Sequence, residues 1–166
     1  MSEFEVDMIV EIPYNSNVKY EFDKDLGLMR CDRILNTSML YPGNYGYIPN
    51  TLSGDGDPLD ILLLSDYSIY PGVVVKVRLI GILYTVDENG EDEKIIAVPV
   101  NKVDSTYENL YYLNDLPQTT LNKVKHFFTH YKDNDSEKWV KVKNFGNRAD
   151  AYNTYKKYLI NSKPKL

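Results

Sequence analysis

The chain has 166 residues, a formal net charge of −5 at pH 7 and a sequence pI near 5.0. This length can bury a sizeable core, so we expect one domain over residues 1–166. The acidic balance argues against a protein that holds nucleic acid through phosphate contacts. The single cysteine, Cys31, cannot form an internal disulfide and is expected to be a small buried hydrophobic residue in a reducing compartment.

The sequence shows no signal for export or for membrane insertion. Residues 1–5 lack the basic and apolar regions of a secretory signal, and no apolar run approaches the length of a membrane span. We therefore expect a cytoplasmic protein with no membrane partner.

Alternating segments at the start of the chain predict strands separated by turns. The first strand covers residues 8–12 and the second residues 18–22. In the second, Lys19 and Glu21 share one face. That face is either a solvated outer surface or the wall of a cleft, and alternation alone does not choose between them.

A third strand is predicted over residues 28–35. Its alternation places Arg33 on the face of Met29 and Cys31. An arginine exposed to solvent seldom shares a strand face with such apolar residues. We therefore expect Arg33 to have an anionic partner. The next segment, residues 41–49, is too rich in glycine and proline for a helix, and its tyrosine hydroxyls either face a polar ligand or cover the core.

An acidic loop then leads into a buried strand. Asp55, Asp57 and Asp60 place three carboxylates within six positions, and the neighbouring glycines permit a sharp turn. The apolar residues 61–64 predict the strand. Asp60 comes immediately before that strand, where an unpaired charge is costly. The loop therefore predicts a site for a hard cation.

Two other interpretations of this loop compete with a cation site. Asp-Gly-Asp-Pro is a common turn, because each of its residue types is favoured in turns. A calcium loop of the EF-hand type needs glycine at its sixth position, where Asp60 stands. The EF-hand interpretation therefore fails, and the third carboxylate favours a cation site over a simple turn.

A long hairpin follows. The β-branched residues 73–86 predict a strand in which Arg78 points outward, and Asn89-Gly90 predicts the turn into a partner strand over residues 94–100. Four carboxylates lie within residues 87–92. In one interpretation the hairpin tip is solvated, because water screens like charges there at little cost. In the other, the tip lies opposite the first acidic loop and completes a metal site with it.

The second half of the chain predicts two helices around a short strand. The first helix begins near Pro117 and ends near residue 131. The strand covers residues 138–142. The second helix covers residues 148–160, with Tyr152, Tyr155 and Leu159 as its inner stripe.

A set of short motifs stands in order along most of the chain. Residues 55–61 follow the pattern Asp, small residue, Asp, Pro or Glu, apolar residue, Asp, apolar residue. Further motifs are Glu11-Ile12-Pro13, Lys19-Tyr20-Glu21, Asp32-Arg33, Tyr41-Pro42, Asn44-Tyr45-Gly46-Tyr47, Asp87-Glu88, Gly90-Glu91-Asp92, Lys94 and Tyr131-Lys132-Asp133. Together, over about residues 10–142, they resemble the soluble family I inorganic pyrophosphatases of the compact bacterial type.

This resemblance implies an α+β, mainly β fold: a closed, OB-like five-stranded β-barrel with two main flanking α-helices and the site at its mouth. It implies hydrolysis of inorganic pyrophosphate to two phosphates by direct attack of an activated water, which pulls pyrophosphate-releasing biosynthetic reactions forward. It also implies several Mg²⁺ ions per site, for which Mn²⁺ or other divalent metals can substitute. Carboxylate-rich loops with few histidines or cysteines independently favour Mg²⁺ or Mn²⁺ over zinc.

The same resemblance implies roles for individual side chains. It makes Asp57 the general base. The implied metal ligands are Asp55, Asp60, Asp87 and Asp92. The implied phosphate-binding side chains are Lys19, Arg33, Tyr45, Lys94, Tyr131 and Lys132. Supporting roles fall to Glu11, Glu21, Tyr41 and Glu88.

Two rival functions compete with this interpretation. One is a different metal-dependent phosphohydrolase that acts on nucleotides or polyphosphate. The other is an OB-type module that binds single-stranded nucleic acid without catalysis, since a fold does not fix a function. The acidic loops and the negative net charge oppose the second.

The two histidines, His126 and His130, lie four residues apart on the first predicted helix and therefore share one face, with Asp133 close to His130 if the helix continues. An exposed polar face and a zinc pair are alternative interpretations, the latter lacking a third ligand. The resemblance implies a homohexamer, a dimer of trimers, and we expect this helix to form a pH-dependent contact within it.

Overall fold

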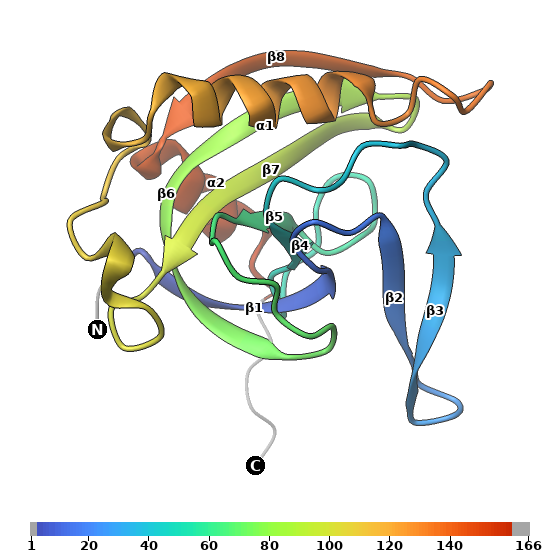
Figure 1. Cartoon of the computed structure of the whole chain (residues 1–166), viewed down its shortest axis with the longest axis horizontal. Helices are drawn as coiled ribbons and strands as arrows, with labels where there is room; N and C mark the ends of the chain where they lie inside the picture. Colours follow the sequence, from blue (N-terminus) through green and yellow to red (C-terminus); the bar gives the residue numbers. More distant parts are fainter. Residues whose placement is uncertain (1–2, 161–166) are drawn as a thin grey trace.

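The computed structural model describes residues 3–160, which form eight strands, two α-helices and two short 3-10 helices. The strands are β1 (Glu5–Ile12), β2 (Val18–Asp23), β3 (Leu28–Ile34), β4 (Asn44–Tyr47), β5 (Asp60–Leu63), β6 (Val74–Asp87), β7 (Gly90–Pro99) and β8 (Val140–Asn147). The helices are α1 (Gln118–His130) and α2 (Arg148–Tyr158), and the 3-10 helices cover Ser105–Tyr107 and Leu113–Asp115. The expected mainly β chain with two main helices is confirmed (Figure 1).

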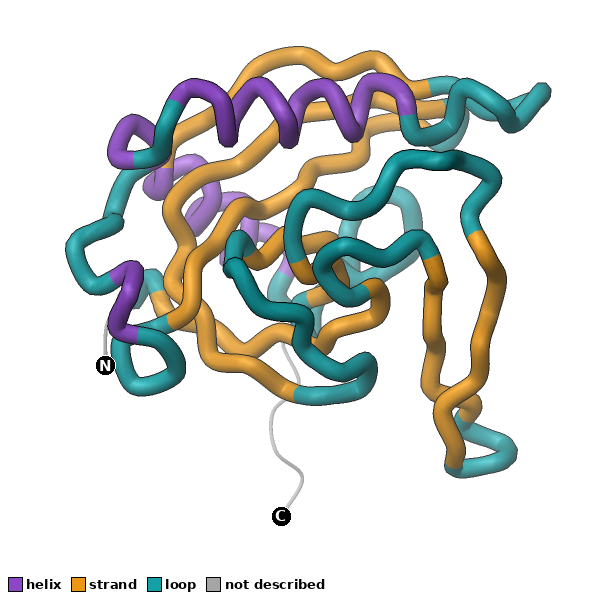
Figure 2. Tube along the Cα trace, in the orientation of Figure 1, coloured by secondary structure: helices purple, strands orange, loops and turns teal. Residues whose placement is uncertain are grey.

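Within residues 3–160, five strands close on themselves into a ring. The sheet order is β1-β4-β5-β7-β6-β8, and a further pairing of β1 with β6 closes the ring, leaving β8 at the outer edge of β6 (Figure 2). The 14-residue β6 pairs with β1 through its first part and with β8 through its second part. A register shift between Leu79 and Gly81 lets the strand bend between the two parts. The predicted closed five-stranded sheet is therefore confirmed.

Apolar side chains cover both faces of the sheet. On β5, Ile61 belongs to a core cluster shared by β1, β6 and β7, whereas Leu62 belongs to the cluster beneath α1. Val124 and Phe128 supply the buried face of α1. Because both faces of β5 are buried, its sequence after Asp60 is continuously apolar rather than alternating.

The strands β2 and β3 form a separate two-stranded arm that projects from the ring (Figure 1). Its exposure makes the prediction of a buried Cys31 wrong. The predicted face of Arg33 is also wrong. Arg33 pairs with Lys19 while Cys31 pairs with Tyr20, so a bulge at Asp32 changes the phase of the alternation and places Arg33 on the Lys19 face.

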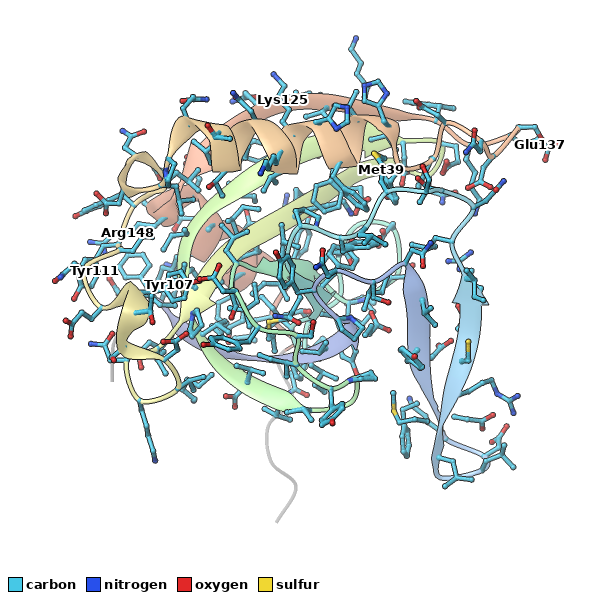
Figure 3. The ribbon with its side chains drawn as sticks, viewed as in Figure 1. Met39, Tyr107, Tyr111, Lys125, Glu137 and Arg148 are labelled. Atoms are coloured by element: carbon cyan, nitrogen blue, oxygen red, sulfur yellow. The ribbon has the colours of Figure 1, made fainter. Side chains whose placement is uncertain are left out.

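Arg78 does not point into solvent as predicted. Its side chain leaves the sheet but is covered by the segment after β7, and Arg78 is only 5% exposed. Its guanidinium donates hydrogen bonds to the Tyr107 and Leu110 carbonyl oxygens and lies 4.6 Å from the centre of the Tyr111 ring. Figure 3 shows Tyr107, Tyr111 and Arg148 gathered at this end of the molecule, away from the arm.

The C-terminal elements differ in extent from their predictions. The strand predicted at residues 138–142 is β8, which begins later and runs to Asn147 because it pairs with β6. The α2 helix begins at a capping box in which Asn147 and Asp150 accept each other's backbone N–H hydrogen bonds, both 2.9 Å. It ends at Tyr158, so Leu159 is exposed and is not part of the inner stripe.

In the part of the chain that the structure describes, no helix is long and apolar enough to cross a membrane.

Candidate active site

One cleft, with a volume of about 340 Å³, gathers side chains from the arm, the acidic loop, the β6–β7 hairpin and the end of α1. Most of the site residues predicted from the sequence line this cleft. They are Glu11, Lys19, Arg33, Tyr41, Tyr45, Asp55, Asp57, Asp60, Asp87, Glu88, Asp92, Lys94, Tyr131 and Lys132. Glu21 is the predicted site residue that does not line it, and faces an adjoining groove with Lys19 and Asp57. The polar face of β2 is thus a cleft wall at Lys19.

The cleft also includes polar residues that the sequence interpretation missed. Asp135 and Lys138 line it from the loop that follows α1, and Asn36 lines it from the loop that follows β3. The Asn36 and Asn134 side-chain amides each donate a 3.2 Å hydrogen bond to the other's backbone carbonyl, which ties these two loops together. Figure 3 shows Glu137 at the outer tip of the loop that follows α1. The polar run after Tyr131-Lys132-Asp133 was the available signal for Asp135 and Lys138.

The acidic loop is held by its own hydrogen bonds. Gly56 adopts a φ of +87°, which a residue with a Cβ rarely tolerates. The Asp55 carboxylate accepts hydrogen bonds from the Ser53 hydroxyl at 2.5 Å and the Asp57 N–H at 3.0 Å. In the described chain, the exposed Asp57 carboxylate has no such partner. It is therefore available to a ligand or a proton.

Lys94 is buried at the centre of the site, 1% exposed. Its ammonium donates hydrogen bonds to the Tyr45 hydroxyl at 2.7 Å, to Asp92 at 2.9 Å and to Asp60 at 3.1 Å. Parallel pairing of β5 with β7 sets Asp60 directly beside Lys94. Burial alone would lower the pKa of Lys94, but Tyr45, Asp60 and the other acidic groups around it raise that pKa well above its usual value. The ammonium therefore stays charged.

A second cation joins the hairpin to the end of α1. The Lys132 ammonium lies 3.2 Å from Asp87 and 3.5 Å from Glu88. Asp87 is 8% exposed, and one of its carboxylate oxygens also accepts the Asn89 N–H at 2.8 Å. The carboxylates of this hairpin are therefore partly a cleft wall rather than a fully solvated tip.

Negative charge exceeds positive charge in the cleft. Its lining includes eight carboxylates against five lysine and arginine side chains. Burial raises the pKa of Glu11 to about 7, with Lys19 opposing the rise and Asp60 adding to it. Burial also raises the pKa of Asp92, against the attraction of Lys94. This excess of carboxylates over basic side chains favours the binding of a cation.

The aromatic floor of the cleft supplies phenol donors. Tyr41 is 3% exposed, and its ring centre lies 5.0 Å from that of Tyr45 and 4.4 Å from that of Phe127. Burial raises the pKa values of Tyr41, Tyr45 and Tyr131. Their hydroxyls therefore remain protonated near neutral pH and can donate to an anionic ligand.

The residues present fit a hard divalent cation. The donors are carboxylate oxygens, which suit Mg²⁺ or Mn²⁺. Among the described residues, no three His, Cys, Asp or Glu side chains are close enough together to form a ready-made metal cage. This arrangement suits Mg²⁺, because that ion keeps several waters and is commonly held by one or two carboxylates together with phosphate oxygens.

The histidines lie outside the cleft lining. The rings of His126 and His130 are 4.9 Å apart between centres, and His130 Nδ1 is 2.8 Å from an Asp133 oxygen. Both histidine side chains lie on the exposed face of α1. The predicted shared face and the proximity of Asp133 are confirmed.

Comparisons with known proteins agree with this geometry. A family described as "Inorganic pyrophosphatase" matches residues 8–163. An inorganic pyrophosphatase of Sulfolobus acidocaldarius is 53% identical over 148 residues, covering 89% of this chain and 86% of the relative. One of Campylobacter jejuni is 49% identical over 158 residues, covering 95% and 92%. A solved inorganic pyrophosphatase of Helicobacter pylori superposes with a TM-score of 0.90 at 46% identity, covering 95% of this chain and 93% of that one.

The buried ammonium generates a stability prediction. We expect Lys94→Met to lower the free energy of unfolding by about 3 kcal/mol, because it leaves Asp60 and Asp92 facing each other without their cation. Urea denaturation in the presence of chelator measures this loss. Lys76→Met is the matched control, since Lys76 and Asp7 form a pair whose side chains are 40% and 49% exposed, and it should cost less than about 1 kcal/mol. Equal losses in the two variants would contradict the prediction.

Proposed function

The chain belongs to the inorganic pyrophosphatase family, and on that premise we propose that it hydrolyses pyrophosphate to two phosphates in the cytoplasm with Mg²⁺ as cofactor. The observation that carries the proposal is that one cleft joins a carboxylate-rich wall to buried lysine and tyrosine donors. Pyrophosphate needs both, because its negative charge repels a water nucleophile until it is neutralised. We further propose that residues 1–166 act as one domain.

The basic and phenolic side chains would bind the substrate oxygens. Arg33 can bind a phosphate bidentately, whereas Lys19 and Lys132 act as point charges. Tyr45 and Tyr131 would donate from the floor of the cleft. The proposed phosphate-binding surface consists of side chains that line the same cleft, which supports the proposal: Lys19, Arg33, Tyr45, Lys94, Tyr131 and Lys132.

Lys94 must change partners to take part. Its three N–H donors are used by Tyr45, Asp60 and Asp92. To bind a phosphate oxygen, the ammonium must release one of these three partners, and we propose that it releases one of the two carboxylates. That carboxylate then becomes available as a ligand, so substrate binding and cation binding are coupled at Lys94.

The acidic wall would hold the metal. The proposed ligands are Asp55, Asp60, Asp87 and Asp92, and Mn²⁺ would substitute for Mg²⁺ at them. Bound Mg²⁺ would neutralise the phosphoryl oxygens and lower the pKa of a water in the site. Glu11, Glu21, Tyr41 and Glu88 would support this shell. Glu88 holds Lys132, and Glu21 acts from the adjoining groove.

Asp57 is the proposed general base. Its carboxylate faces the cleft and has no hydrogen-bond partner among the described residues. Its neighbour Asp55 is instead held by two hydrogen bonds within the loop. Asp57 can therefore accept the proton of the attacking water without giving up a structural contact.

The first test is phosphate release. We expect the protein to release phosphate from pyrophosphate with Mg²⁺ and to lose this activity with excess chelator, because the cleft is otherwise too negative for the substrate. A parallel assay with ATP distinguishes a more general phosphohydrolase. Full activity in chelator would reject the metal mechanism, and faster release from ATP would favour that rival.

Asp57→Asn and Asp60→Asn should fail in different ways. Asp60→Asn should weaken Mg²⁺ binding strongly, because it removes a proposed ligand. Asp57→Asn should keep most of the metal affinity and lose rate by roughly 10²–10⁴-fold, the usual contribution of a general base. Titration calorimetry with Mg²⁺, alongside the phosphate assay, separates the two. Equal losses of metal affinity would remove the distinction.

We also propose that the protein assembles as a homohexamer, a dimer of trimers, with the exposed face of α1 as one contact. His126, His130 and Asp133 form a compact cluster there. Protonation of histidine in mild acid would add positive charge to this contact and alter it.

Light scattering at neutral and mildly acidic pH tests the assembly. The wild type should be hexameric at neutral pH and change its assembly in acid, whereas a His126→Gln, His130→Gln double variant should lose that pH dependence. A wild-type monomer would reject the hexamer. Identical behaviour of the variant and the wild type at both pH values would reject the histidine contact.

A further inference from the structure

Glu93 occupies a position between two cleft residues but lies on the other side of its strand. It stands on β7 between Asp92 and Lys94, so its side chain points to the opposite face. The residue is 9% exposed, and its carboxylate accepts a 3.1 Å hydrogen bond from the Tyr158 hydroxyl at the end of α2. Burial raises the pKa of Glu93, and the hydrogen bond opposes that rise. The Tyr158 hydroxyl therefore satisfies a costly buried carboxylate on the back of the active-site strand.

The hydroxyl is suited to donate permanently. Burial, together with the hydrogen bond and charge of Glu93, raises the pKa of Tyr158 to about 12. The ring packs against the core cluster inside the sheet. Tyr158 is thus a partly buried tyrosine whose hydroxyl remains a donor and whose ring packs against the core.

The main chain at the same point is tied to the acidic loop. The Leu52 N–H donates to the Tyr158 carbonyl at 2.9 Å, and the Ile160 N–H donates to the Asn50 carbonyl at 2.8 Å. Between them, Thr51 and Leu159 form an isolated antiparallel bridge. The end of α2 therefore pairs with residues 50–52, directly before the acidic loop.

Those residues form the neck of the loop. The Thr51 hydroxyl donates to the Ile48 carbonyl at 2.6 Å and accepts the Leu59 N–H at 2.9 Å, which closes the neck. Above it, the Ser53 N–H donates to the Asp57 carbonyl at 2.8 Å. A Cβ added to Gly54 would lie 4.0 Å from the Tyr158 hydroxyl, so the loop passes directly over that group.

We propose that Tyr158 is a positioning residue that sets the separation of the two carboxylate groups in the cleft. Its side chain holds β7, which carries Asp92, and its main chain holds the loop that carries Asp55 and Asp57. The inference rests on the proposed function in assigning these carboxylates to Mg²⁺. It gives the C-terminal helix, which no sequence motif explained, a part in building the site.

The expected effect is on metal affinity rather than on substrate affinity. Without the hydroxyl, the hydrogen bond that links β7 to the end of α2, and through it to the acidic loop, is lost. Cation binding must then supply the entropy cost of fixing β7 and the loop relative to each other. Partners of metal ligands typically change affinity by about 10–100-fold when removed. Tyr158 acts one residue away from Asp92, so we expect Tyr158→Phe to weaken Mg²⁺ binding by about threefold to tenfold. The KM for pyrophosphate at saturating Mg²⁺ should change by less than about twofold, because the phosphate-binding side chains keep their contacts.

The experiment compares Tyr158→Phe with Tyr155→Phe, which removes a hydroxyl from the same helix and the same core cluster without touching Glu93. Mg²⁺ and Mn²⁺ binding is measured by calorimetry without substrate, and melting temperature is recorded for each variant. Weaker metal binding in Tyr158→Phe alone supports the proposal. Equal metal binding in the two variants overturns it, whatever their melting temperatures, because a purely structural role would change only stability.

Variants of the acceptor provide an independent arm. Glu93→Gln keeps a carbonyl oxygen for the hydroxyl and should bind Mg²⁺ within about twofold of wild type, whereas Glu93→Leu should match Tyr158→Phe. The Glu93→Leu, Tyr158→Phe double variant should be no worse than either single variant, because both remove the same interaction. Additive losses would overturn the proposal. If the wild type binds Mg²⁺ without hydrolysing pyrophosphate, the proposed function fails, and the calorimetry still decides the role of Tyr158.

Discussion

The buried ammonium of Lys94 is the interaction on which the cleft depends. It joins Tyr45 of β4, Asp60 of β5 and Asp92 of β7, and these strands are neighbours in the ring. Removing a charge from water is costly, so the arrangement is stable only because every donor of the ammonium finds an oxygen. The same ammonium keeps Asp60 and Asp92 together in spite of their mutual repulsion. Ring closure therefore places carboxylates where their repulsion would otherwise oppose folding.

Charge in the cleft is divided in a way that suits two ligands of opposite sign. Carboxylates outnumber cations, and the raised pKa of Glu11 reflects burial together with the surrounding acidic groups. The lysines and buried phenols, in turn, offer donors that an anion can use. Lys94 contacts both sets. A cation bound at Asp60 and Asp92 would compete with the Lys94 ammonium for these carboxylates, and an anion bound at Lys94 would compete with the carboxylates for the ammonium. Each ligand would therefore free the groups that bind the other. This coupling is the physical basis of the proposed metal-dependent hydrolysis.

The strand β7 transmits constraints between the cleft and the C-terminal helix. Asp92 and Lys94 face the site, while Glu93 between them faces α2 and accepts the Tyr158 hydroxyl. The strand is buried from Glu93 onward, pairs with β6 along its length and pairs with β5 from Lys94, so its two faces are held by the same backbone contacts. An element outside the cleft can therefore affect cleft geometry through a single hydrogen bond.

Local sequence patterns determined much of the fold, and the resemblance of ordered motifs to a known family named most of the residues that line the cleft. The apolar run after Asp60, the Asn89-Gly90 turn and the α1 periodicity depend on neighbours in the chain, and each gave the correct element. Only the tertiary structure decided the face of Arg33, because a bulge reverses alternation without a local signal. It alone also decided the Tyr158 contact, whose partners are 65 residues apart. Such contacts follow from ring closure and helix docking, which depend on the packing of the whole chain rather than on the spacing of nearby residues.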